Sequence, residues 1–145
     1  MNVIIVNPAT CTLQEWHNFD THADYGPGGP DAQLRDYLQG LSDGTVLVGV
    51  SCDEPSKELD AAEATLSALG ANVSDVGWRG AFVFSAQKGH PASTLLDKEL
   101  TETSAIGRQP QIIATFSGTQ YDLSQKQLSR LHISTLCPQN APLMH

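Results

Sequence analysis

The sequence is poor in positive charge. Eight Lys and Arg residues stand against 16 Asp and Glu residues, so the 145-residue chain carries a formal net charge of −8. A chain of this charge repels phosphate backbones and anionic lipid surfaces, because like charges oppose the approach. We therefore expect neither nucleic acid nor a membrane surface as a partner.

The sequence also lacks long hydrophobic runs. No segment approaches the roughly 18 to 20 consecutive apolar residues that a membrane helix needs, and the N-terminus shows no basic segment followed by an apolar signal core. The hydrophobic content of 40% is nevertheless enough to bury a core. We expect one soluble globular unit, either intracellular or the mature form of a secreted protein.

Cysteine is scarce. Cys11, Cys52 and Cys137 lie far apart in the sequence and form no CxxC pair. This spacing argues against a zinc site and gives no sign of a disulfide framework, while the odd number leaves at least one thiol free or paired between chains. Buried free cysteine is the simplest interpretation.

Motifs of catalysis and of cofactor binding are absent too. The chain contains no GxSxG elbow, no GxGxxG and no GxxxxGK[ST] phosphate loop, and its five histidines show no recognisable spacing with a serine or cysteine. A triad built from distant residues is compatible with this pattern, so the exclusion of a hydrolase is weak. We expect no catalytic residues and no cofactor.

One segment has the composition of a metal site. Glu15 and His17 are two residues apart, and Asp20, His22 and Asp24 continue at similar steps. Residues two apart share one face of a strand, so such pairs can ligate a metal together. An exposed strand edge followed by a turn has the same composition, and we favour that interpretation over a metal site.

The spacing of apolar residues and the runs of β-branched residues predict the secondary structure. The expected helices cover residues 31–41, begun by an Asp31 cap, and residues 59–69. The expected strands cover residues 2–6, 13–19, 45–51, 81–85 and 111–116, the first two as a hairpin. Residues 125–133 fit either a helix or a strand. The partial alternation favours an α+β fold, with a mixed sheet and helices against it, over a doubly wound parallel sheet.

Two pairs of residues at strand ends have the chemistry of a sugar site. Asp53 and Glu54 follow the strand at 45–51, and Trp78 and Arg79 precede the strand at 81–85. If these strands are neighbours, both loops emerge at the same edge of the sheet. A carboxylate and a guanidinium bind sugar hydroxyl groups, and an aromatic ring covers the apolar face of the sugar. The alternative is that Trp78 fills the core and Arg79 forms a structural ion pair with Asp53.

Four ordered segments add a family resemblance. They are residues 2–21, DGTVLV at 43–48, ALG at 68–70, and GWR through KG at 77–89. Together they resemble the interleukin-like EMT inducer and PANDER domain, also called the GG domain, over about residues 2 to 118. The domain is similar to the stem lectin module of the protein O-mannose N-acetylglucosaminyltransferase.

The resemblance implies a fold and a site. It implies a sandwich of curved antiparallel sheets flanked by helices, with no catalytic centre. In the stem module, an acidic residue after the DGT strand and the arginine of GWR hold β-linked N-acetylglucosamine, and these positions match Asp53 and Arg79. The chain departs from the family pattern beside this site, with Gly80 and Ala81-Phe82 after GWR and Ala86-Gln87 before KG.

We therefore expect a single domain at residues 1–118 with a C-terminal extension at residues 119–145. The expected function is a secreted, non-catalytic lectin for β-linked galactose- or N-acetylglucosamine-type glycans, with a carbohydrate site at Asp53, Glu54, Trp78 and Arg79. Glycans or glycoproteins are the expected partners, and weak single sites favour a homo-oligomer. The alternative function is a cytokine-like signalling protein that acts through a protein-binding surface.

Overall fold

The computed structural model describes residues 1–10, 12–22, 26–51, 59–78, 80–99, 111–116 and 129–134, and for residue 99 and the last two ranges it describes the backbone alone. All three cysteines lie outside these residues, so the predictions about them stay predictions.

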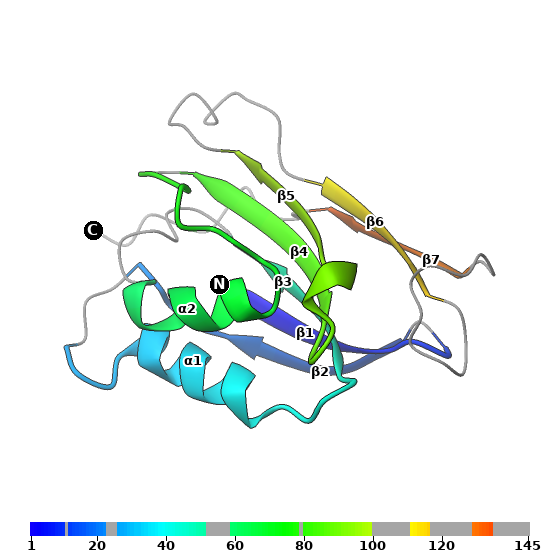
Figure 1. The fold of residues 1–145 in the computed structure, drawn as a ribbon, viewed down its shortest axis with the longest axis horizontal. Helices are drawn as coiled ribbons and strands as arrows, with labels where there is room; N and C mark the ends of the chain where they lie inside the picture. The colour runs from blue at the N-terminus through cyan, green and yellow to red at the C-terminus, as the bar shows by residue number, and fades with distance from the viewer. Residues whose placement is uncertain are drawn as a thin grey trace, which may run out of the picture.

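The main layer is an open, antiparallel five-stranded sheet with the order β2-β1-β3-β4-β5 (Figure 1). Its strands are β1 (Asn2–Asn7), β2 (Thr12–Asn18), β3 (Val46–Val50), β4 (Ala81–Gln87) and β5 (Leu95–Glu99). The predicted hairpin of β1 and β2 is confirmed. Every strand pair is antiparallel, so of the mixed and antiparallel arrangements that the sequence allowed, the antiparallel one is present.

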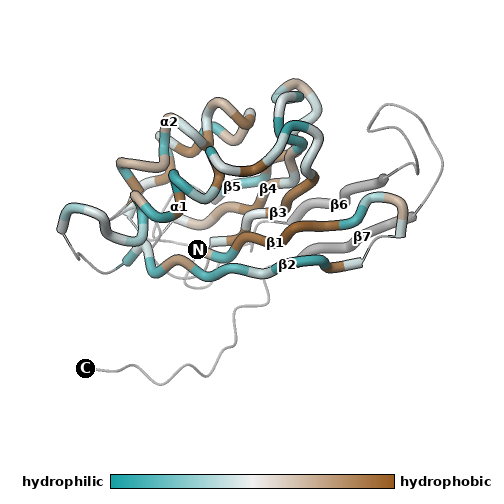
Figure 2. The backbone as a smooth tube through the Cα atoms, turned by 90° about the horizontal axis from the view of Figure 1, so that it is seen from below, coloured by the Kyte–Doolittle hydropathy of each residue, from teal (hydrophilic) through white to brown (hydrophobic). Residues whose placement is uncertain are grey.

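Two helices cover one face of this sheet (Figure 2). They are α1 (Pro30–Gly40) and α2 (Asp60–Ala68), both close to their predicted bounds. Leu34 and Leu38 of α1 and Leu66 of α2 are fully buried against strand residues that include Phe82 and Phe84. The α+β class, with helices flanking antiparallel strands in one domain, is confirmed.

The central strands β3 and β4 are buried on the opposite face of the sheet as well. Val46, Val48, Val50 and Val83 are all buried, although they do not belong to the core cluster under the helices. A second sheet of two antiparallel strands, β6 (Gln111–Phe116) and β7 (Ser129–Ser134), places β6 against β4 and β5. Burial on both faces explains why β3 reads as a continuous apolar run rather than as an alternating one.

Two elements were not predicted as they occur. The polar stretch after β4 contains a short 3-10 turn at Pro91–Ser93 and then β5, which pairs with β4. Residues 125–133, which the sequence allowed to be either a helix or a strand, overlap β7, and β7 pairs with β6. Because β7 lies beyond residue 118, the extension at residues 119–145 contributes a strand. The boundary at residue 118 stays a prediction.

Gly49 leaves no room for a side chain, and its substitution tests the packing. A Cβ atom at this position would meet Phe84 Cε1 at 2.1 Å and Met1 Cε at 2.9 Å. We expect Gly49→Ala to lower the free energy of unfolding by about 1–3 kcal/mol because of this overpacking. Chemical denaturation measures the change.

Gly40 provides the matched control. It ends α1, and nothing lies within 4 Å of a Cβ atom built on it. Gly40→Ala is expected to leave stability unchanged or to raise it by up to about 1 kcal/mol, because alanine favours a helix. Equal effects of the two substitutions would contradict the packing described for Phe84.

Candidate functional site

The sheet brings the end of β3 and the beginning of β4 to the same edge, as the sequence analysis anticipated. Val50 pairs with Val83, and Ser51 continues the pairing beyond the strand. The Ser51 hydroxyl accepts a hydrogen bond from the Phe82 N–H at 2.7 Å and donates one to the Phe82 carbonyl at 3.1 Å. Ser51 N–H donates to the same carbonyl at 2.9 Å. These three bonds fix where the chain leaves β3 and where it enters β4.

Of the four predicted carbohydrate-binding residues, Trp78 is the one that the structure describes. Its side chain is 51% exposed, just before β4. An indole of this exposure does not fill the core, so the core interpretation of Trp78 is wrong. Asp53, Glu54 and Arg79 lie outside the described residues, and their roles stay predictions.

The N-termini of α1 and α2 lie at the same end of the domain as the beginning of β4 (Figure 1). Both helices begin at the left-hand end of the molecule in Figure 1, where β4 also begins. The sequence analysis assigned Asp31 as the cap of α1, whereas α1 begins at Pro30 with Gly29 as its N-cap. Asp31 lies in the first turn, where its carboxylate accepts hydrogen bonds from Ala32 N–H at 2.7 Å and Ala61 N–H at 3.3 Å.

Asp31 of α1 therefore caps the N-terminus of α2. The amides of a first helical turn have no partner within the helix, and Ala61 lies in the first turn of α2. One carboxylate on α1 thus satisfies an amide of α2 and lies near the positive ends of both helix dipoles. Sequence spacing does not reveal such a contact, because Asp31 and Ala61 are distant in the chain.

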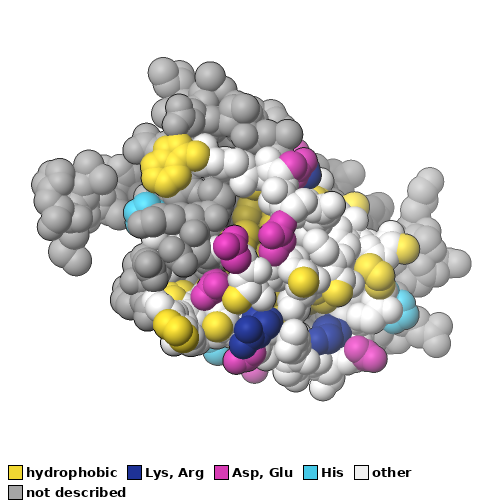
Figure 3. Space-filling model, turned by 60° about the vertical axis from the view of Figure 1, so that its left-hand side comes forward, with side chains coloured by type: hydrophobic (Ala, Val, Ile, Leu, Met, Phe, Trp, Pro, Cys, Tyr) yellow, Lys and Arg dark blue, Asp and Glu magenta, His cyan; other side chains and the backbone are white. Residues whose placement is uncertain are grey.

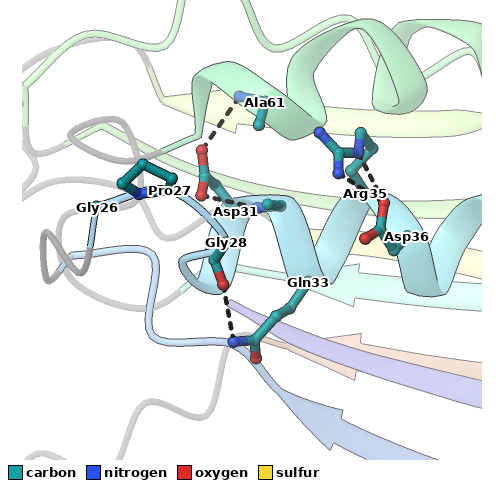
Figure 4. Close-up of a pocket in the computed structure, with 9 residues that line it drawn as sticks. Gly26, Pro27, Gly28, Asp31, Gln33, Arg35, Asp36 and Ala61 are labelled. Carbon is teal, nitrogen blue, oxygen red and sulfur yellow. Dashed lines mark hydrogen bonds and ion pairs between the residues drawn. The ribbon is translucent and has the colours of Figure 1, made fainter.

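A shallow polar cavity opens beside Asp31 (Figure 4). Its volume is about 390 Å³, and the side chains that give it its chemistry are Asp31, Gln33, Arg35 and Asp36. Gln33 Nε2 donates to the Gly28 carbonyl at 3.2 Å, and Arg35 binds the Asp36 carboxylate at 2.7 Å. Carboxylates, an amide and a guanidinium offer both donors and acceptors, which suits a ligand with several hydroxyl groups.

This cavity was not predicted from the sequence. The signal that was available is the loop with Gly26, Pro27 and Gly28 followed directly by a helix whose first turns carry Asp31 and Arg35. The face of the molecule drawn in Figure 3 carries several acidic side chains and few Lys or Arg residues. The net charge of −8 disfavours anionic ligands and is compatible with neutral ones.

A separate cluster lies where β2 meets α1. Tyr37 donates its hydroxyl to Glu15 Oε2 at 3.3 Å, and His17 Nε2 lies 3.4 Å from the same oxygen. The rings of His17 and Tyr37 are 4.4 Å apart, and Phe19 lies beside them. Partial burial raises the pKa of Tyr37 to about 12, and the charge and hydrogen bond of Glu15 contribute to this increase.

The segment from Glu15 to Asp24 had the composition of a metal site. Among the described residues, no three His, Cys, Asp or Glu side chains come together in a way that would hold an ion. All seven residues of β2 are exposed, which agrees with the favoured interpretation of this segment as a solvated edge. Asp24 lies outside the described residues.

The chain matches the model of a known family. The model of the interleukin-like EMT inducer family matches residues 1–90, which include β1 to β4 and both helices. The chain belongs to this family. The expected resemblance is therefore confirmed at the level of the interleukin-like EMT inducer domain, whereas nothing confirms the similarity to the glycosyltransferase stem module. None of the curated proteins compared with the chain matches it. Within its described part, this interleukin-like EMT inducer domain has no helix long and apolar enough to span a membrane.

Replacing Asp31 tests its contact between the helices. We expect Asp31→Ala to lower the free energy of unfolding by about 1 kcal/mol, because α2 loses a capping partner and both helix N-termini lose a nearby negative charge. Thermal or urea unfolding measures the change. Asp36→Ala is the control, since this carboxylate is 66% exposed and pairs with the adjacent Arg35. A comparable loss in both variants would contradict the bridging role.

Tyr37 should show its environment in a pH titration. Its pKa in the folded protein is about 12, above the ordinary value of 10.0, so its contribution to stability is complete below pH 10 and is lost as the pH rises through 12. In Glu15→Gln we expect the pKa of Tyr37 to fall only part of the way to 10, because burial, the larger cause, remains. Titration of the Tyr37 NMR resonances measures this. An equal decrease in Asp36→Asn would contradict the role of Glu15.

Proposed function

We propose that this interleukin-like EMT inducer domain is a secreted, non-catalytic lectin. Its ligands are glycans or glycoproteins that carry β-linked galactose- or N-acetylglucosamine-type sugars. The carbohydrate site comprises Asp53, Glu54, Trp78 and Arg79, at the edge where β3 ends and β4 begins. Trp78 provides the stacking surface, and the carboxylates and the guanidinium bind hydroxyl or acetamido groups.

The exposure of Trp78 carries this proposal. Leaving 51% of an indole exposed at the entrance to β4 forgoes hydrophobic stabilisation that burial would supply. A sugar ring laid on the indole recovers part of that stabilisation. The Ser51–Phe82 hydrogen bonds support the same proposal, because a rigid strand edge holds the residues around a binding site in place.

The polar cavity at Asp31, Gln33 and Arg35 supports an extended ligand. It opens at the end of the domain where α2 begins, and α2 follows directly on the segment that contains Asp53 and Glu54. In this proposal, a terminal sugar occupies the Trp78 site and a further sugar unit reaches the cavity. A shallow site of this kind binds one sugar weakly, so useful affinity requires several sites in one assembly.

The second candidate function is signalling through a protein surface, as the family name suggests. The observation that favours it is the pair of exposed apolar side chains on β2, Leu13 at 62% and Trp16 at 58%. Exposed apolar groups of this size mark surfaces that bind proteins when they lie next to one another. The two candidates use different parts of the domain, and separate variants therefore test them.

Glycan binding by Trp78 and Arg79 variants tests the lectin. We expect the wild type to bind β-linked galactose- or N-acetylglucosamine-terminated glycans on an array. Trp78→Ala should bind about 2- to 13-fold more weakly, because a stacking contact contributes about 0.5–1.5 kcal/mol. Arg79→Ala should weaken binding at least as much, because a charge-assisted hydrogen bond is lost.

The control is Leu95→Ala, which removes a 40% exposed apolar side chain from β5. Its glycan binding should equal that of the wild type, and all three variants should unfold at nearly the wild-type temperature. A wild-type protein that binds no glycan overturns the proposal. Glycan binding that is unaffected by Arg79→Ala removes this residue from the site.

A further inference from the structure

The strand β2 is an unprotected edge of the sheet. It is the last strand on its side, and all of its residues from Thr12 to Asn18 are exposed. The N–H and C=O groups along the outer side of such a strand are a template for pairing with another strand. Proteins usually block this pairing with lysine, proline or several charges, but β2 contains no Lys, Arg or Pro, and Glu15 is its one acidic residue.

The opposite edge of the same sheet is protected. The strand β5 carries three consecutive charged residues, Asp97, Lys98 and Glu99. Lys98 forms an ion pair with Asp75, and it donates a hydrogen bond to the Asn72 carbonyl at 3.2 Å. In addition, β6 lies against β5. The two edges of one sheet therefore differ, and β2 is the one suited to strand addition.

The exposed apolar side chains of β2 lie on one face of the strand. Leu13 pairs with Val6 and Trp16 pairs with Ile4, across an irregularity in the register between them. Residues that pair across antiparallel strands point to the same face, and Val6 and Ile4 belong to the face away from the helices. Glu15 and His17 pair with Ile5 and Val3, which lie in the core under the helices.

We propose that β2 pairs with β2 of a second copy of this chain. The two strands run antiparallel about a two-fold axis that passes midway between the two copies of Trp16, and the two sheets join into one. In this register Trp16 lies opposite Trp16 of the second copy, and Glu15 lies opposite its His17. Aromatic cross-strand pairs stabilise an antiparallel sheet, and the Glu15 carboxylate can accept a hydrogen bond from an imidazole N–H.

Side-chain complementarity along β2 favours this register. A two-fold axis perpendicular to the sheet must pass midway between two copies of one residue, because residues that face each other across antiparallel strands point to the same face of the sheet. An axis between two copies of Glu15 would place two carboxylates opposite each other, which is repulsive. An axis between two copies of His17 would place Trp16 opposite Asn18 and would leave Glu15 without a facing hydrogen-bond donor. Among these three central registers, the one at Trp16 alone pairs the indoles and places Glu15 opposite an imidazole that can donate a hydrogen bond to it.

The proposed dimer does not depend on glycan binding. It does explain how single weak sites become multivalent, since each copy contributes one site at Trp78, outside the paired strands. Because the contact joins single seven-residue strands, we expect it to bury less than a standard interface of about 1,600 Å² and to have a dissociation constant in the micromolar range.

Sedimentation equilibrium or size-exclusion chromatography with light scattering, over about 1 µM to 1 mM, tests the dimer. The wild type should convert from monomer to dimer within this range. Trp16→Lys and Glu15→Lys should each weaken dimerisation by at least about tenfold, because each places an unmatched cation at the paired edge. Leu95→Lys, which adds the same cation to the other edge, should change it by less than about twofold.

A charge exchange distinguishes the register from a general loss of apolar surface. His17→Glu alone should weaken dimerisation, because it faces Glu15 of the second copy. The double variant Glu15→Lys with His17→Glu should recover it, because each lysine then faces a glutamate of the second copy. A wild type that stays monomeric throughout overturns the proposal, including the case in which β2 binds a different protein. Failure of the double variant to recover overturns the Trp16 register. Dimerisation is read out without glycan, so a negative glycan array leaves this test unaffected.

Discussion

The contact between Phe84 and the bare backbone of Gly49 determines how the rest of the domain packs. The Phe84 ring occupies the space where any other residue at position 49 would place its Cβ atom. The ring can therefore lie close to β3, nearly parallel to Phe82, and both rings fill the core under the helices. Leu34, Leu38 and Leu66 of the helices pack against these rings in the same buried cluster. The distance between the helices and the sheet therefore depends on how closely Phe84 approaches Gly49. The position of both helix N-termini, and hence of the polar cavity, follows from that distance.

Local patterns were sufficient for most elements of the fold. The β-branched run of β1, the leucine spacing of α1 and the alanine-rich stripe of α2 each have one structural solution, and the structure contains all three. The strand β5 was missed because its charged residues, Asp97 to Glu99, resemble a loop in sequence. It becomes a strand through its pairing with β4. The same holds for β7, which depends on β6. The strand order was not predictable either, because it is set by contacts between distant residues.

The candidate site was predictable in its location but not in its details. Two loops that flank neighbouring strands must emerge together, and the register of β3 with β4 confirms that step for the described residues. Whether Trp78 faces the core or the solvent depends on how much space the core leaves, which the residue type does not reveal. The contact of Asp31 with Ala61 was not predictable either, because it joins two helices whose residues are 30 positions apart in the sequence. Such contacts give the site its polar cavity, and they arise only in the folded domain.

The difference between the two edges of the main sheet also limits how large an assembly can become. A sheet with two bare edges can recruit copies at both, and such head-to-tail addition continues into fibres. Here a symmetric contact at β2 would use the bare edge of both partners at once. The edges of the main sheet that remain are two copies of β5, each charged and accompanied by β6. Growth of the main sheet by strand addition would therefore stop at a closed pair, which disfavours amyloid-like aggregation through this sheet.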